Sequence, residues 1–236
     1  YKWLNTTQIE RVWEQMHLAH ELEAKEIWIV NVGDIKPMEL PTQFFLDYAW
    51  DPDRWNPENL EDYYLDWSAQ IFGENFAGPV ADILAAYTLF NSRRKPELLA
   101  PDTYSLTHYR EAERVLNEYR ELEELAEFIY KDIPEELKNA YYQLVLFPVK
   151  ACANLNELYY SAGKNKLYAK QGRAATNLMA DRVRELFRAD SLLTEYYHNE
   201  LAGGKWNHMM SQTHIGYTYW QQPEQNNIPE TIEIGL

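Results

Sequence analysis

The first apolar pattern along the chain is that of an amphipathic helix. Apolar residues recur at spacings of three and four from Ile9 to Leu22. Thr7 to Glu10 spell T-x-x-E, the pattern of a capping box. These features predict a helix that begins at Thr7 and extends to about Lys25.

The next segment has the pattern of a buried strand. Residues 27–32 (IWIVNV) form a continuous apolar run that is too short for a typical helix. Helix, short loop and buried strand make one repeat of an α/β architecture. A lone parallel strand is not stable by itself, so we expect its neighbours to come from residues outside this chain. A loop then leads to a short helix over 42–50, with Pro41 in its first turn.

Residues from about 56 onwards follow helical periodicities. Asn56 as N-cap and Pro57 at the first helical position predict the start of a helix. Breaks are predicted at Gly73, at Gly78–Pro79 and over 93–105.

A long helical stretch covers about 106–202. Its first helix has an apolar stripe that is typical of bundles, with acidic residues between its members. The stripe consists of Ala112, Val115, Tyr119, Leu122, Ala126 and Ile129. Pro148 is predicted to kink or divide the helix that ends near Gly163. Further helices are predicted over 165–188 and 191–201, and a period-two pattern at 215–220 indicates a strand or extended segment.

Composition narrows the functional classes. The 236 residues include 37 acidic and 22 basic side chains, a net charge of −15, and only 9 glycines. The charge argues against nucleic-acid and anionic-membrane partners, and the scarcity of glycine favours helices. No apolar run approaches the roughly 18 residues of a membrane span. The single cysteine, Cys152, is expected to be buried and inert, and no motif implies a cofactor.

His17 and His20 are the residues that most resemble a metal site. Their HLAHE spelling matches neither H-E-x-x-H nor H-x-x-E-H, and no third ligand is apparent. We therefore favour packing and predict no metal.

The loop after the predicted strand is the best candidate site. Ligands of parallel α/β folds bind at the carboxyl ends of strands, where Asn31, Asp34, Lys36 and Glu39 would lie. An amide, a cation and two carboxylates suit an acidic sugar, with Lys36 pairing with its carboxylate. The alternative is structural: Asn31 and Asp34 brace the turn, and Lys36 pairs with Glu39.

Aromatic side chains are a second candidate feature. Trp50 and, in the tail, Tyr217, Tyr219 and Trp220 have rings that could stack on sugars. Packing in the core or at a domain interface is the alternative for each of them.

Two long segments resemble glycoside hydrolase family 115, the xylan α-glucuronidases. They are WIVNVGDIKPMELPTQFFLDYAW (28–50) and KWNHMMSQTHIGYTYWQQP (205–223). The resemblance implies a fold that is mainly α: a helical bundle preceded by one helix and one strand of a (β/α) barrel. It assigns 1–50 to the end of that barrel, 51–205 to the bundle, and 206–236 to an extended linker toward a C-terminal β domain.

The resemblance also implies an activity. It is the inverting hydrolysis that releases glucuronic acid, or its 4-O-methyl ether, from glucuronoxylan or aldouronic oligosaccharides, without a cofactor. Asp34 is then the candidate catalytic residue, and Asn31, Lys36, Glu39, Trp50, Tyr217 and Trp220 are candidate substrate-binding residues. The enzyme is expected to be secreted or periplasmic, with a homodimer as one assembly to consider.

The chain itself is expected to be an inactive fragment. It opens without Met, in what reads as mid-domain, and catalytic residues of such barrels come from several strands. Its partners would then be the remaining domains of the same enzyme. The alternatives are a helical scaffold or interaction domain without catalysis, and a carbohydrate-binding unit.

Overall fold

The computed structural model describes residues 3–33, 35–218 and 221–235, and they are mainly helical. No strand forms within these ranges, where residues 218 and 221 make an isolated β-bridge. The fold class predicted from the sequence, mainly α, is confirmed. The elements are α1 (Ile9–Glu21), α2 (Glu39–Trp50), α3 (Leu60–Phe72), α4 (Glu74–Arg93), the 3-10 turn η1 (Pro96–Leu98), α5 (Glu111–Asp132), α6 (Glu135–Tyr141), the π-helical turn η2 (Tyr142–Leu146), α7 (Phe147–Lys170), α8 (Thr176–Asn199) and the 3-10 turn η3 (Leu201–Gly204).

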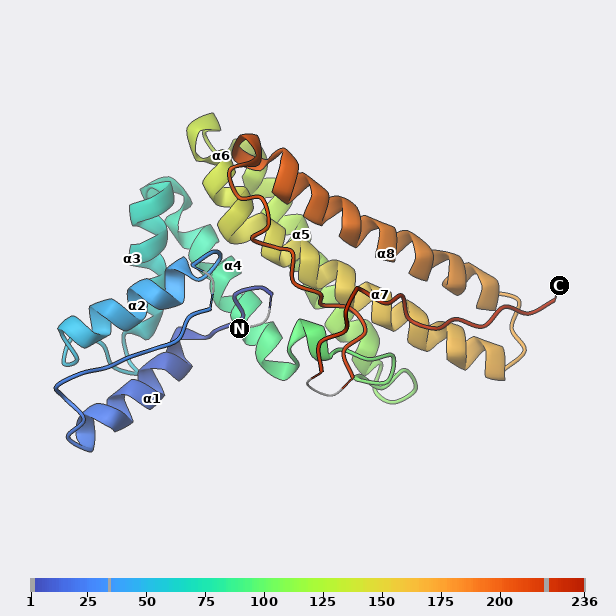
Figure 1. Cartoon of the computed structure of the whole chain (residues 1–236), viewed down its shortest axis with the longest axis horizontal. Helices are drawn as coiled ribbons and strands as arrows, with labels where there is room; N and C mark the ends of the chain where they lie inside the picture. The colour runs from blue at the N-terminus through green and yellow to red at the C-terminus, as the bar shows by residue number, and fades with distance from the viewer. Residues whose placement is uncertain (1–2, 34, 219–220, 236) are drawn as a thin grey trace.

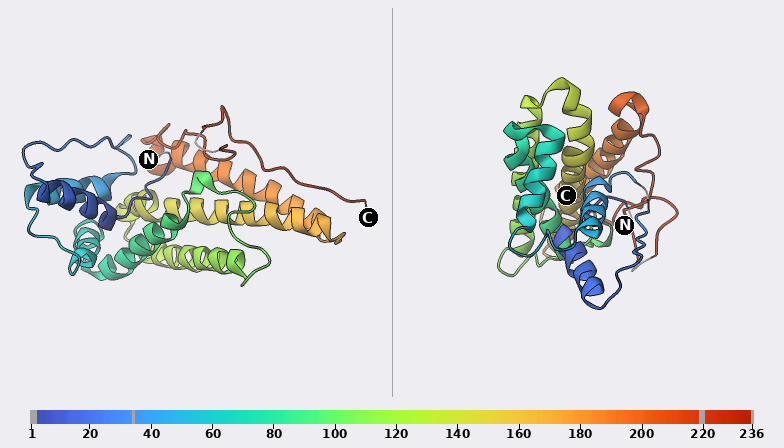
Figure 2. Two further views of the ribbon diagram at one scale, coloured as in Figure 1. Left: turned by 90° about the horizontal axis from the view of Figure 1, so that it is seen from below. Right: turned by 90° about the vertical axis from the view of Figure 1, so that its left-hand side faces the viewer.

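The molecule is elongated, and its long axis follows α7 and α8 (Figure 1). Helix α7 packs against both α5 and α8, while α3 packs against α4 and α1 against α2. Helices α1 to α3 gather at one end of the molecule, and the C-terminal segment runs along the bundle to the other end (Figures 1 and 2). None of the described helices combines the length and apolar character that a membrane crossing requires.

The apolar stripe of α5 faces the core, as predicted. All six residues of the stripe are buried, and they belong to the same core cluster as the apolar faces of α4 and α7, except Ala112 at the start of α5. The acidic side chains of Glu121 and Glu124 lie on the exposed side. Burial of this stripe holds the helix in place, because isolated helices gain little stability from propensity alone.

The core is continuous across residue 50. The rings of Phe44 in α2 and Tyr63 in α3 meet edge to face with 4.8 Å between centroids. Tyr63 also donates a hydrogen bond of 2.8 Å to the Asp47 carboxylate. The segments predicted to belong to a barrel and to a bundle therefore pack against each other directly.

Pro148 interrupts the helix, as predicted. The π turn η2 precedes it, and the N–H of Phe147 donates to the carbonyl of Tyr142 five residues back. Proline has no N–H for the carbonyl of Leu144, and its ring crowds that carbonyl. A widened turn relieves this conflict without ending the helix.

Both predicted N-caps are wrong. Helix α1 begins at Ile9 and lacks a side-chain cap, and the N–H of Thr7 donates instead to the side chain of Asn5 at 3.0 Å. Helix α3 begins at Leu60, because Asn56 accepts the N–H of Glu58 in a turn that precedes the helix. In both cases a local amide turn competes successfully with the helix start.

Two glycines predicted to break helices lie inside them. Gly78 and Pro79 are the fifth and sixth residues of α4. Pro79 lies past the first turn, so the carbonyl of Asn75 lacks its usual helical N–H donor, yet the helix continues to Arg93. Gly163 lies within α7, which continues to Lys170, so α8 begins at Thr176 and not at residue 165.

The predicted barrel remnant is not confirmed. Residues 27–32 are extended but belong to no sheet in the described chain, and most of the run predicted to be buried is exposed, with Trp28 and Val32 half-buried. Ile27 and Ile29 are 79% and 91% exposed. A strand that is apolar on both faces remains exposed when no neighbouring strand covers it.

The first residues of the chain meet the segment after η3 beside α8. The ring of Trp3 stacks on that of His214 with 3.6 Å between centroids. His214 Nε2 lies 2.9 Å from the Asp190 carboxylate, and both residues are almost fully buried. This contact joins the first residues of the chain to the segment that follows η3.

Candidate functional site

The loop between residue 32 and α2 begins with a side-chain-braced turn. The Asn31 side chain is exposed, and its Oδ1 accepts the N–H of Gly33 at 3.0 Å. Gly33 has a φ of 68°, in the left-handed region that glycine adopts readily. Asn31 therefore braces this turn, as the structural alternative predicted. Asp34 lies outside the described residues.

Lys36 and Glu39 form an ion pair at the start of α2. Their side chains are only 19% and 24% exposed, and the peptide bond between Lys36 and Pro37 is cis. Glu39 is the first residue of α2, where the helix dipole favours a carboxylate. The structure thus brings together two of the predicted site residues.

Gln143 completes a polar cluster with this pair. Lys36 Nζ donates to Gln143 Oε1 at 3.1 Å, and Gln143 Nε2 donates to Glu39 Oε1 at 3.3 Å. Gln143 is 3% exposed and belongs to the π turn η2, a type of distortion that is frequent at functional sites. Lys36, Glu39 and Gln143, together with Trp206, are called the lysine cluster below.

Trp206 contributes an aromatic face to the lysine cluster. Lys36 Nζ lies 4.3 Å from the centroid of its ring, in cation–π geometry. The other Glu39 oxygen, Oε2, is buried and has no hydrogen-bond partner within the described residues. The cluster therefore holds a fixed cation beside a carboxylate with unused acceptor capacity.

Sequence reasoning missed Gln143 and Trp206. Gln143 stands alone as a polar residue in the apolar run YYQLVLF, and a buried amide requires a partner. A single polar residue in an apolar run was therefore the sequence signal that could have identified Gln143. Nothing in the spacing of Trp206 points to Lys36, which lies 170 residues earlier in the chain.

The remaining candidate residues lie elsewhere. Trp50 is 91% exposed at the far end of α2, about 17 Å along the helix from Glu39. Tyr217 is half-buried, and burial together with the nearby Glu97 carboxylate raises its pKa. Trp220 and Tyr219 lie outside the described residues.

The two helical histidines pack on tryptophans. His17 stacks on Trp13 with 4.7 Å between centroids, and its Nδ1 lies 3.2 Å from the Tyr48 hydroxyl. His20 meets the ring of Trp28 edge to face. Both residues thus take the packing role that the sequence favoured.

Cys152 is a buried, unreactive thiol. It is fully buried in α7, and burial raises the pKa of its thiol to about 12. The thiolate is the nucleophilic form, so this cysteine is not poised for covalent catalysis.

A groove of about 770 Å³ lies over α7 between α5 and α8. Most of its charged side chains are paired with one another: Lys150 with Glu123 and Glu127, Glu157 with Arg120 and Arg182, and Arg182 with Glu185. Lys131 also lines the groove. Most of the charge in the groove is therefore neutralised locally.

Comparisons with known proteins point to one family. Residues 1–98 match the profile of glycosyl hydrolase family 115. A solved structure of BtGH115A, a family GH115 4-O-methyl-α-glucuronidase with specificity for decorated arabinogalactans, matches with a TM-score of 0.73 and 27% identity. The match covers 89% of this chain and 28% of that chain. No curated protein matches.

The two matches complement each other. The profile covers the segment that carries the lysine-cluster loop, and the structural match extends over most of the helical bundle. Together they show that this chain is similar to glycoside hydrolase family 115, in sequence over residues 1–98 and in fold over most of its length.

Proposed function

We propose that this chain is part of an α-glucuronidase that removes glucuronic acid, or its 4-O-methyl ether, from xylan. The observation that carries the proposal is the likeness to a 4-O-methyl-α-glucuronidase over 89% of the chain. That relative acts on decorated arabinogalactans, so the polysaccharide backbone is a matter for experiment. The chain spans about 28% of the relative's length, and the activity proposed here belongs to the whole enzyme.

The lysine cluster is the proposed contact for the acidic sugar. A uronate carboxylate can accept a charge-assisted hydrogen bond from Lys36 Nζ. Gln143 fixes the position of this ammonium group from one side, and the Trp206 ring faces it from another. Glu39 balances its charge when no sugar is bound. We keep four further residues as proposed substrate-binding residues: Asn31, Trp50, Tyr217 and Trp220.

Asp34 is proposed as one carboxylate of an inverting pair. Inversion requires a general acid and a general base on opposite faces of the sugar ring, about 6.5–9.5 Å apart. Active-site residues of (β/α) barrels come from several strands, so the second carboxylate is expected outside this chain. The isolated chain is therefore expected to be inactive.

The proposed architecture follows from the same family. Residues 1–50 would complete a (β/α) barrel, with 27–32 as one of its strands. Residues 51–205 would form the helical domain, and 206–236 would lead toward a β domain. The exposed side chains of Ile27, Ile29 and Val30 support this arrangement, because neighbouring barrel strands would cover them. Export to the periplasm or the medium would give the enzyme access to polysaccharide.

The test uses the full-length enzyme on glucuronoxylan and on glucuronidated arabinogalactan. We expect release of glucuronic acid or its methyl ether from at least one polymer, with the β-anomer appearing first in NMR spectra. No release from either polymer would overturn the proposal and favour a scaffold or carbohydrate-binding role. Release by residues 1–236 alone would contradict the expected inactivity of the isolated chain.

Lys36→Met tests the proposed contact. Loss of one hydrogen bond to a charged group should lower kcat/KM about 10- to 100-fold. Glu39 and Gln143 also lose a partner, so the thermal unfolding midpoint should fall, and activity is compared at temperatures well below that midpoint. Lys25→Met is the matched control, since Lys25 lies in the same segment and pairs only with the exposed Glu23 among the described residues. Equal effects of the two substitutions would remove Lys36 from the substrate site.

A further inference from the structure

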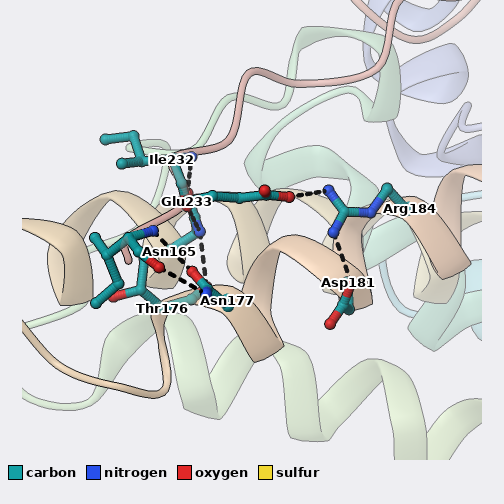
Figure 3. Close-up of polar contacts among 8 residues, drawn as sticks. Asn165, Thr176, Asn177, Asp181, Arg184, Ile232 and Glu233 are labelled. Carbon is teal, nitrogen blue, oxygen red and sulfur yellow. Dashed lines mark hydrogen bonds and ion pairs between the residues drawn. The ribbon is translucent and has the colours of Figure 1, made fainter. Parts of the chain in front are cut away.

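The C-terminal segment lies extended on the tip of the α7–α8 hairpin. Asn165, near the end of α7, accepts the N–H of Ile232 at 2.7 Å and donates to its carbonyl at 2.9 Å. Asn177, the second residue of α8, accepts the N–H of Ile234 at 2.9 Å and donates to its carbonyl at 3.0 Å. Figure 3 shows both asparagines beneath the segment.

The spacing of these contacts matches the geometry of a strand. In an extended chain, residues two apart present their N–H and C=O groups to the same side. A side-chain amide carries one acceptor and a donor group in a plane, as a neighbouring backbone peptide does. The two asparagines therefore pair with Ile232 and Ile234 as an adjacent strand would, although the hairpin is helical.

The asparagine from α7 is held in place by the hairpin. Asn165 is fully buried, and its amide also donates to the carbonyl of Thr176 at 2.9 Å. Thr176 is fully buried and its hydroxyl donates to the carbonyl of Arg173 at 2.6 Å. Both N–H groups of the Asn165 amide are thus used, one for the hairpin and one for the tail.

Side chains of the segment contribute little specificity. Ile232 remains 44% exposed. Glu233 pairs with Arg184 at 2.9 Å, and Arg184 also pairs with Asp181, but these groups are about half exposed or more, so the pairs stabilise weakly. Recognition rests on the backbone groups of two residues.

We propose that Asn165 and Asn177 form a peptide-binding site that reads the backbone of an extended segment. Its occupant is the chain's own residues 232–234. The site accepts any side chain at the two bonded positions but excludes proline, which has no N–H to donate. Its role is to fix the path along which the chain leaves the helical bundle.

Amide hydrogen exchange of the complete chain, followed by NMR, tests the site. The amides of Ile232 and Ile234 should exchange about tenfold or more slowly than those of Thr231 and Glu233, whose N–H groups have no acceptor in the described chain. Equal exchange at all four amides would overturn the proposal.

Substitutions separate backbone recognition from side-chain recognition. The double variant Ile232→Ser/Ile234→Ser should keep the slow exchange of the amides of residues 232 and 234. Ile234→Pro removes the N–H that Asn177 accepts, and it should also speed exchange at Ile232 severalfold or more. Loss of protection in the serine variant would contradict backbone reading.

Asn177→Ala should release Ile234, and it should leave the fold intact because Asn177 is only half-buried. Asn154→Ala is the matched control. It removes a half-buried side-chain amide that donates to the carbonyl of Leu186 in the same hairpin and makes no hydrogen bond to residues 232–234. The proposal would be wrong if the Ile234 amide still exchanged slowly in Asn177→Ala, or if it exchanged fast in Asn154→Ala.

Discussion

Buried polar side chains mark the places where distant parts of this chain meet. Gln143 contacts Lys36, 107 positions earlier, and Asn165 contacts Ile232, 67 positions later. A buried polar group without a partner costs about 1–3 kcal/mol, so each of these residues fixes one segment relative to another. Single amides thereby secure segments that contribute little apolar surface.

His198 predicts a pH-dependent stability at one such contact. Its Nε2 accepts the N–H of Met210 at 3.1 Å, and burial, together with the neighbouring His208, lowers the pKa of His198. The unfolded chain therefore binds the proton more readily, and the free energy of unfolding should fall as the pH drops below about 6.5. Protonation would also remove the acceptor that Met210 uses.

Chemical denaturation of His198→Gln between pH 7.5 and 5 checks this prediction. Glutamine keeps an acceptor but does not titrate, so the variant should lose less stability than the wild type over this range. His108→Gln, at an exposed loop histidine, should retain the wild-type dependence. A His198→Gln profile that parallels the wild type would refute the prediction.

At the scale of elements, α7 is the helix on which the others are assembled. It packs against α5 and α8 and is buried along much of its length. Gly163 lies where the loop before α5 crosses it: an added Cβ would stand 2.4 Å from the Pro101 carbonyl oxygen and 3.0 Å from Leu106 Cδ1. The absence of a side chain permits this close approach.

Two glycine substitutions should have unequal effects. Gly163→Ala should destabilise the chain by about 1–3 kcal/mol, because the backbone oxygen of Pro101 has to move. Gly78→Ala in α4 meets no atom within 4 Å beyond its chain neighbours. The new Cβ would crowd the ring of Pro79, which offsets the gain in helix propensity, so the free energy of unfolding should change by no more than about 0.5 kcal/mol. Denaturant titration measures both, and equal losses would contradict the packing argument.

The sequence predicted long helices better than their boundaries. The α5 stripe and the interruption at Pro148 follow from local periodicity and from proline chemistry, and both are confirmed. Gly163 appeared to end a helix, because the approach of Pro101 is a tertiary contact that local patterns do not encode. The pairing of Lys36 with Glu39 was predictable at a spacing of three, whereas Gln143 required knowledge of the fold.

At the scale of the whole molecule, apolar surface is distributed unevenly. The bundle buries its stripe residues, but Ile27, Ile29 and Ile35 are at least 75% exposed on one continuous segment. Such a concentration of exposed apolar side chains indicates a surface that another part of a protein covers. In the proposed architecture that part is the rest of the barrel.

Ile29→Lys tests this view of the segment. In the isolated chain it should change the free energy of unfolding by no more than about 0.5 kcal/mol, whereas Ile83→Ala in the core should cost about 2–5 kcal/mol. In the full-length enzyme the same lysine should lower the thermal unfolding midpoint and reduce soluble yield. A large loss in the isolated chain would show that the segment is already packed.

The α7–α8 hairpin also sets a distance. Gln143, immediately before α7, holds the lysine cluster, and Asn165, near the other end of α7, holds the tail. These residues are separated by 22 positions, or roughly 33 Å of helical rise. The hairpin therefore acts as a rigid spacer that holds residues 232–234 at a fixed distance from the lysine cluster. Lengthening α7 by one turn would increase that distance by about 5.4 Å.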